Sequence, residues 1–230
     1  MGPRFLRGLV MLCVVSVCVS MACRKPRRHV LSKKQIQAIQ AATLTEAPSP
    51  LVVVGARFED LVELVGVDMP TGPVIAGKTL EVTWYWKSLK EAPGEWMIFV
   101  HVEGGGQRST HDHHAVGELH PISRWKGGDL VADKQKITLP ADFPEGRARL
   151  KVGIFDEGAW RDRRQNRRMA VTNGDLSTVK SDGESRVEVG TLVIKSDGAK
   201  KNRDDKSDRT YEALRVDKGP ILDGKLIEAG

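Results

Sequence analysis

Apolar residues in the middle of the chain recur in short runs with a period of two. This period places every second side chain on one face, which is typical of a half-buried β-strand. Leu80, Val82, Trp84 and Trp86 share one face in this way, so both tryptophans are expected in the core. Turn signals rich in Gly, Pro, Asn and Asp separate the runs. The predicted strands are residues 51–54, 61–67, 79–86, 96–102, 130–139, 147–155 and 187–194.

No long helical pattern interrupts these strands, which favours an all-β fold, an antiparallel β-sandwich over residues 51–195. Before it, residues 23–50 are interpreted as a tether, in which Ser32 and Gln35 form a capping box that opens a short helix. After it, residues 196–209 have no apolar side chain larger than alanine. They are expected to be a disordered linker, because they bury too little surface to offset the entropy of ordering.

Residues 1–22 have the order of a secretory signal. Arg4 and Arg7 give a basic start, residues 9–19 are apolar, and small residues precede Cys23. The apolar run is too short to span a bilayer, which needs about 20 residues. The ending resembles the lipobox of bacterial lipoproteins. That resemblance implies that Cys23 is acylated, becomes the mature N-terminus and holds the protein at the membrane.

Two features keep other interpretations of the N-terminus open. Ser20 stands where leucine is usual in a lipobox. The basic cluster at residues 24–28 is also unusual, since positive charge beside an apolar segment tends to stay on the cytoplasmic side. A plain signal or short anchor, and a cytosolic N-terminus, are the alternatives.

Composition limits how the chain gains stability and what it binds. All three cysteines lie in the targeting region, so a chain cleaved at Cys23 would form no disulfide within its folded part and needs a full hydrophobic core. The net charge is +6, with basic residues scattered among acidic ones, which together with the export signal argues against nucleic acid as a partner. The basic residues suit an anionic lipid or polysaccharide surface, or serve solubility alone.

A series of short motifs follows a characteristic order along the predicted sandwich. The motifs are Gly66-Val67-Asp68, Ala76-Gly77-Lys78-Thr79-Leu80, Val82-Thr83-Trp84-Tyr85-Trp86-Lys87, Ile98-Phe99-Val100-His101-Val102, Asp112, Pro121-Ile122-Ser123-Arg124-Trp125, Gly128-Asp129, Asp133, Ile137-Thr138-Leu139-Pro140 and Val152-Gly153-Ile154-Phe155-Asp156. In this order they resemble an immunoglobulin-like β-sandwich module of bacterial envelope proteins and of some membrane glycosyltransferases. The resemblance implies the fold, and it implies no catalytic residues.

A second resemblance lies at the C-terminal end, in residues 210–230. Tyr211-Glu212-Ala213-Leu214-Arg215, Gly219-Pro220-Ile221 and Asp223-Gly224-Lys225-Leu226 are similar to the opening strand of carbohydrate-binding modules of the family-9 type. The resemblance implies a truncated start of such a module, without its sugar-contacting residues.

Three histidines around Asp112 form a candidate metal site. Imidazole and carboxylate groups are ligands that zinc and copper use. In an extended segment His111 and His113 point one way and His114 the other, and His101 or His120 could complete a site. The alternative is a polar loop after the Gly104-Gly105-Gly106 turn, in which Asp112 holds the backbone.

Aromatic and basic residues in predicted loops form a candidate ligand-binding set. Trp125 and Trp160 lie beside arginines and lysines, where a flat ring could stack on a sugar. The guanidinium groups of Arg161, Arg163 and Arg164 could form bidentate hydrogen bonds with phosphate or carboxylate groups of an acidic polysaccharide. The alternative for these arginines is a solvated hairpin loop whose charges pair with nearby acidic residues.

Catalytic patterns are missing from the sequence, which has no G-x-S-x-G elbow, phosphate loop or H-E-x-x-H motif. We therefore expect no enzyme and no cofactor. The sequence predicts a lipid-anchored cell-envelope protein that binds surface polysaccharide or a protein partner through its sandwich. Arg24 after Cys23 favours the outer membrane by the sorting rule known from enterobacteria. A structural spacer, or a metal-binding module through residues 111–114, are the alternatives.

Overall fold

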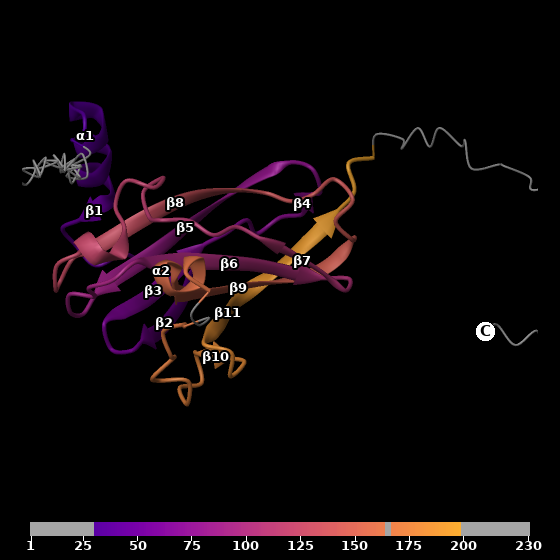
Figure 1. The fold of residues 1–230 in the computed structure, drawn as a ribbon. Coiled ribbons are helices and arrows are strands. Elements are labelled where there is room, and N and C mark those ends of the chain that lie inside the picture. The colour runs from indigo at the N-terminus through magenta and orange to yellow at the C-terminus, as the bar shows by residue number, and fades with distance from the viewer. Residues whose placement is uncertain (1–29, 164–166, 199–230) are drawn as a thin grey trace, which may run out of the picture.

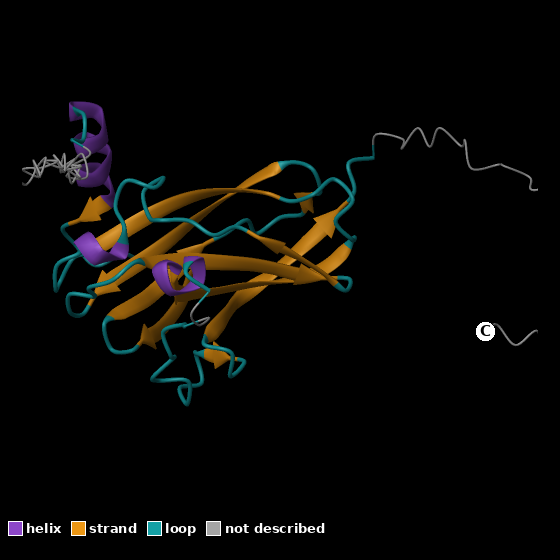
Figure 2. Cartoon of the chain, viewed as in Figure 1, coloured by secondary structure: helices purple, strands orange, loops and turns teal. Residues whose placement is uncertain are grey.

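Two β-sheets packed face to face make up the fold (Figures 1 and 2). The computed structural model describes residues 30–163 and 167–198. Neighbouring strands of this part are antiparallel, apart from one short parallel pair between residues 74–75 and 194–195. The fold is thus all-β, an immunoglobulin-like sandwich, as the sequence predicts.

The first sheet has five strands, in the spatial order β1-β8-β5-β3-β2. Their bounds are Thr43–Leu44 for β1, Leu130–Thr138 for β8, Thr79–Ser88 for β5, Val62–Asp68 for β3 and Val52–Phe58 for β2. The second sheet follows the order β10-β11-β9-β6-β7, and β4 pairs with β11. Its bounds are Lys180–Ser181 for β10, Arg186–Lys195 for β11, Gly146–Asp156 for β9, Trp96–Gly104 for β6, Gln107–Thr110 for β7 and Val74–Ile75 for β4.

The core lies between the sheets and follows the alternation of the sequence. Along β5, Leu80, Val82, Trp84 and Trp86 are all buried, which confirms the prediction for the two tryptophans. In the register of the first sheet, Trp86 lies opposite Val131 of β8. All seven predicted strands correspond to strands of the structure.

Strand β7 was not predicted from the sequence, which indicates only a turn at Gly104-Gly105-Gly106 before it. The strand reads Gln-Arg-Ser-Thr and has no apolar alternation to reveal it. It pairs with β6 through a two-residue turn in which Gly105 has φ 55° and Gly106 has φ 78°. Two positive φ angles in a row suit a tight hairpin turn, because that backbone follows the twist of the strands.

In the described part of the chain, three short helices accompany the sheets: α1 (Lys33–Ala42), the 3-10 helix η1 (Ile122–Arg124) and α2 (Glu157–Arg161). Helix α1 begins at the predicted capping box, with the Ser32 hydroxyl accepting from Gln35 N. No helix in the described part of the chain is long and apolar enough to cross a bilayer. The predicted signal, Cys23, residues 199–209 of the predicted linker and the resemblance at 210–230 lie outside the described residues.

Candidate functional site

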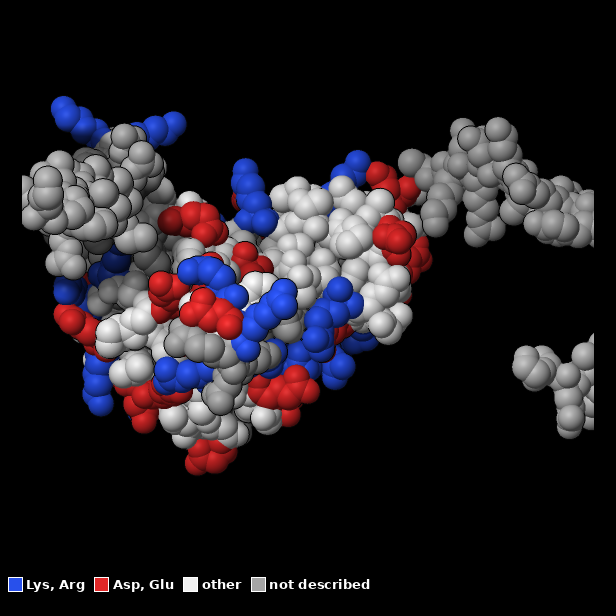
Figure 3. Space-filling model, in the orientation of Figure 1, with Lys and Arg blue, Asp and Glu red and all other residues white. Residues whose placement is uncertain are grey.

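The outer face of the second sheet gathers most of the buried charge in the described residues. Ile98, Val100 and Val102 of β6 point into the core, so the side chains between them point outward. In the register, His101 lies opposite Lys151 of β9 and Glu103 lies opposite Arg149. Figure 3 shows basic side chains gathered on the side of the molecule that Figure 1 labels β6, β7 and β9, with acidic side chains among them.

A group of paired charges, termed here the ion network, lies across the middle of this face. Its members are the carboxylates Glu103, Asp182 and Glu184 and the cations Arg108, Lys151 and Arg186. Glu103 lies 2.8 Å from Arg186 and 3.2 Å from Lys151, and Asp182 lies 2.9 Å from Lys151. The Lys151 and Arg186 side chains are only 6% and 5% exposed, so each needs its partners to offset the loss of hydration.

The ion network shifts the pKa values of its members and of His101. Burial acts to raise the pKa of Asp182, but hydrogen bonds from Lys151 and Arg186 outweigh it and lower that pKa to about 2. The pKa of Glu103 is likewise lowered by Lys151 and Arg186, against burial. Burial, followed by the positive charges of Arg108 and Arg186, lowers the pKa of His101 to about 4. His101 is therefore neutral at pH 7, and its Nδ1 can accept from Arg186 Nη1 at 3.2 Å.

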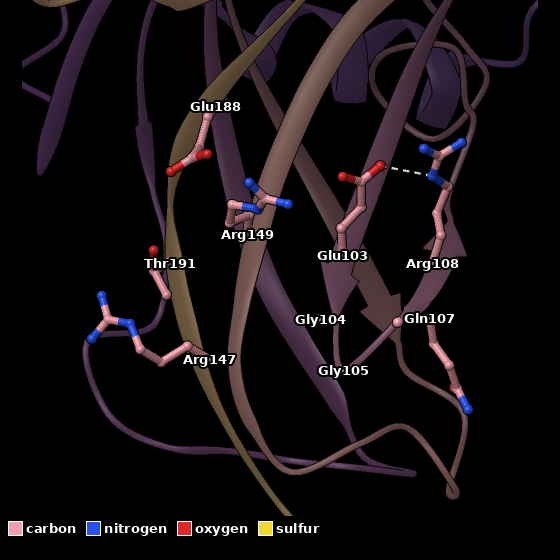
Figure 4. A pocket seen from close by; sticks show the side chains of 10 residues that line it. Glu103, Gly104, Gly105, Gln107, Arg108, Arg147, Arg149, Glu188 and Thr191 are labelled. Atoms are coloured by element: carbon pink, nitrogen blue, oxygen red, sulfur yellow. Dashed lines mark hydrogen bonds and ion pairs between the residues drawn. The ribbon is translucent and has the colours of Figure 1, made fainter. Parts of the chain in front are cut away.

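A hollow of about 730 Å³, termed the turn hollow, lies at the β6–β7 end of the face (Figure 4). Its rim includes the backbone of Gly104–Gly106 and the outward side chains of Arg147 and Arg149 from β9. Within the described residues, neither of these arginines forms an ion pair, whereas Arg108 beside them binds Glu103 at 2.7 Å. The turn hollow thus presents two unpaired guanidinium groups.

A second hollow, of about 290 Å³ and termed the aromatic hollow, lies at the opposite end near α2. Phe155 and Trp160 meet there edge to face, with 6.5 Å between ring centroids. The Arg168 guanidinium lies 4.8 Å from the centroid of the Phe99 ring. Trp160 is 63% exposed, so one aromatic surface at this hollow is open to solvent.

The two tryptophans predicted to bind a ligand differ in their positions. Trp160 is exposed as a stacking ring needs to be. Trp125 is 1% exposed, packs against Trp86 with 6.4 Å between ring centroids, and donates its indole N–H to His120 O. A ring enclosed in this way cannot stack on a ligand, so the prediction of a ligand-binding Trp125 is wrong. Residues 121–125 fold over the end of the sandwich and carry the ring inward.

The predicted arginines lie on or just after α2. Arg161 binds Glu157 at 2.9 Å and Glu95 at 3.1 Å, so its charge is already paired as the alternative interpretation proposed. Arg163 is exposed, and Arg164 lies outside the described residues. These pairs make Arg161 a weaker ligand group than the unpaired Arg147 and Arg149.

The candidate metal ligands His111, His113 and His114 do not converge. His111 Nε2 lies 2.8 Å from Ser109 Oγ, and His114 Nε2 lies 3.2 Å from Glu157. His113 is bound within the sandwich, 2.8 Å from Asp133. Among residues 30–163 and 167–198, no three His, Cys, Asp or Glu side chains are grouped so that they could hold a metal ion.

Arg147 and Arg149 are the site residues that the sequence interpretation missed. Both lie on the polar face of the predicted strand 147–155, in phase with Lys151 and opposite to the apolar Leu150. That alternation was a usable signal, since cations repeated on one strand face must share one surface of the sheet.

Comparisons with known proteins identify no family. No protein-family model and no curated protein match the chain. Among solved structures it is similar to the CARDB domain of a Pyrococcus furiosus protein in complex with di-metal ions. The identity is 14%, the match covers 66% of this chain and 100% of that chain, and the TM-score is 0.31. The fold assignment rests on the two sheets of this chain.

Proposed function

We propose that this chain is a lipid-anchored cell-envelope protein whose β-sandwich binds surface polysaccharide without catalysing a reaction. The supporting observation is that one sheet face combines the exposed ring of Trp160 with two hollows and a row of cations. Concave surfaces with a few placed polar groups are typical of ligand sites. Acylation of Cys23 and outer-membrane localisation are proposals from the sequence alone.

The ligand chemistry follows from the groups on that face. A partly exposed aromatic ring offers a flat apolar surface to the C–H faces of a sugar, and guanidinium groups donate hydrogen bonds to its oxygens. A sheet face with two hollows along it suits a chain-like ligand better than a compact one. A polysaccharide meets these requirements.

The carboxylates of the ion network are unsuited to acid catalysis, unlike Asp112 at the aromatic hollow, where burial raises the pKa. Glycoside hydrolysis needs one carboxyl group that is protonated near neutral pH and can act as an acid. Both Glu103 and Asp182 are held ionised by their cationic partners, with pKa values below the usual range. They are suited to hold the face together rather than to transfer a proton.

The test of binding is migration of the chain through native gels that contain polygalacturonate or, as a neutral comparison, dextran. We expect retardation by polygalacturonate, and loss of that retardation in Trp160→Ala. Val53→Ala is the matched control, because Val53 is 67% exposed on β2 of the other sheet. Equal migration of the unmodified chain in every gel would support the structural-spacer alternative instead.

The test of anchoring is the intact mass of the membrane-fraction protein, with and without Cys23→Ala. A mass that begins at Cys23 and includes acyl chains, absent from the variant, is the expected result. A mass that retains Met1 would contradict the lipoprotein proposal and would leave the binding proposal to its own test.

A further inference from the structure

We propose that the turn hollow is a subsite for an acidic sugar unit, in which Arg149 binds the carboxylate of a uronic acid and Arg147 adds positive charge at the edge of the hollow (Figure 4). This inference deepens the proposed function and rests on it, because the sugar unit is part of the same polysaccharide. In this proposal, Arg147 and Arg149, rather than Trp160, give the face its preference for acidic over neutral sugars.

Arg147 and Arg149 lie outside the paired charges of the face. The ion network contains three carboxylates and three cations, each within 4.0 Å of a partner of opposite charge, and Arg168 lies 4.0 Å from Glu184 at its edge. Arg147 and Arg149 have no ion-pair partner among the described residues. Glu103 and Glu188 line the same hollow but lie beyond ion-pair distance of these two guanidinium groups, which are therefore available to an anion from solution.

Backbone of the β6–β7 turn forms part of the rim of the hollow. A Cβ atom on Gly104 would lie 2.9 Å from both Ala148 Cβ and Arg147 O, and one on Gly105 would overlap Pro144. The chain needs glycine at these two positions for steric reasons. Glycine at these positions lets the β6–β7 turn pass close to Ala148 and Pro144, and the turn contributes its backbone to the rim of the hollow.

The hollow is lined by a mixture of groups that favours a sugar acid over a dense polyanion. Glu188, Thr191 and Gln107 line it together with the arginines (Figure 4). A carboxylate such as Glu188 repels a polyphosphate but accepts hydrogen bonds from sugar hydroxyl groups. A uronic acid offers both a carboxylate for the guanidinium groups and hydroxyls for Glu188, so it fits this lining.

The two hollows are spaced along strand β9. Arg149 and Phe155 both point outward from β9 and are six residues apart, which corresponds to about 20 Å along a strand. The turn hollow and the aromatic hollow therefore lie along one line. An extended oligosaccharide could place a neutral ring on Trp160 and an acidic unit beside Arg149.

The experiment compares oligogalacturonates with their methyl esters, which have the same rings without the charge. Calorimetric titration of the unmodified chain is expected to show tighter binding of the acid than of the ester. The double variant Arg147→Gln/Arg149→Gln should lose about tenfold or more in affinity for the acid and less than twofold for the ester. Trp160→Ala should weaken both ligands.

A matched control separates a specific site from the effect of net charge. Arg57→Gln/Lys136→Gln removes the same charge from the first sheet, where the two side chains are 51% and 76% exposed. Its affinity for the acid should stay within twofold of the unmodified chain. Equal weakening by the two double variants would overturn the acidic subsite.

The outcomes also separate the two proposals. If the double variant at residues 147 and 149 binds the acid as well as the unmodified chain does, the subsite is wrong and polysaccharide binding stands. If the unmodified chain binds neither the acid nor the ester, polysaccharide binding is wrong and the subsite fails with it. Thermal unfolding of each variant shows whether a loss of binding comes from a loss of folding.

Discussion

His113 Nε2 lies 2.8 Å from the fully buried carboxylate of Asp133, and this contact ties the loop after β7 to strand β8. The other oxygen of Asp133 accepts from Val116 N at 2.8 Å. A buried carboxylate with two donors is well satisfied. His113, one of the histidines that suggested a metal site in the sequence, therefore helps to hold the loop after β7 in place.

The protonated nitrogen of His113 is fixed by a chain of donors that begins at Trp84. The indole N–H donates to Gln135 Oε1 at 2.9 Å, which orients the Gln135 amide. The amide nitrogen then faces His113 Nδ1 at 3.0 Å and donates to it. Nδ1 therefore accepts, and the N–H at Nε2 donates a hydrogen bond to Asp133.

We predict that Asp133→Asn lowers the free energy of unfolding by about 2 kcal/mol. The new amide group must leave a buried donor unpaired at His113 or at Val116, which costs roughly that amount. Urea unfolding measures the change, and nitrogen chemical shifts of the unmodified chain should show the proton on His113 Nε2. An unchanged stability would contradict the assignment of a structural role to this contact.

The two tryptophans of the predicted ligand set should respond oppositely to truncation. Trp125→Ala should lower the free energy of unfolding by about 4 kcal/mol, because it leaves a large cavity beside Trp86. Trp160→Ala should change it by no more than about 0.5 kcal/mol, because the ring is exposed. Thermal or urea unfolding of both variants checks this. Similar losses in the two would contradict the burial difference.

The sandwich could be predicted because its strands show the alternation that a two-sided sheet imposes. Trp84 and Trp86 share a face with Leu80 and Val82, and that phase alone places them in the core. Trp125 shows no such phase. Its charged neighbours Arg124 and Lys126 suggested that it is exposed. In the structure Trp125 caps the end of η1, and its ring is buried in the core.

The candidate site could be predicted only in part. Arg147 and Arg149 are visible as an outward row on a predicted strand, and Trp160 is visible as a ring among polar residues. Their pairing state was hidden, because the ion network draws on β6, β7, β9, β11 and residues 182–184, which are far apart in the sequence. Such long-range contacts decide which cations remain free to bind a ligand.

We predict that Gly153→Ala destabilises the second sheet and disturbs the aromatic hollow. A Cβ atom there would overlap the Phe99 ring and lie 2.7 Å from Ser185 O, so the ring must move. The expected loss is about 1–3 kcal/mol, as for overpacked sites. Gly72→Ala is the control, since nothing lies within 4 Å of the added atom. Chemical unfolding of the two variants gives the difference in their free energies of unfolding. An unchanged stability of Gly153→Ala would contradict close packing between Gly153 of β9 and Phe99 of β6.

The stability of the sandwich should fall as the pH drops from about 6.5 to about 4 because of His101. Its pKa is lowered from 6.5 to about 4 in the folded state, so over this range the unfolded chain binds a proton that the folded chain excludes. Stability therefore rises with pH across this window, by at most about 3 kcal/mol from this one group. Below about pH 4 both states are protonated at His101, and the carboxylates of the ion network govern further loss.

His101→Asn isolates this contribution, because its side-chain oxygen can still accept from Arg186 while the side chain no longer titrates. The variant should lose less stability than the unmodified chain between pH 6.5 and pH 4, and the two curves should run parallel below pH 4. Burial also lowers the pKa values of His111 and His120, so some pH dependence should persist in the variant. Urea unfolding at half-unit pH steps resolves the difference. Identical pH profiles for the two proteins would show that His101 is not held neutral by the buried charges around it.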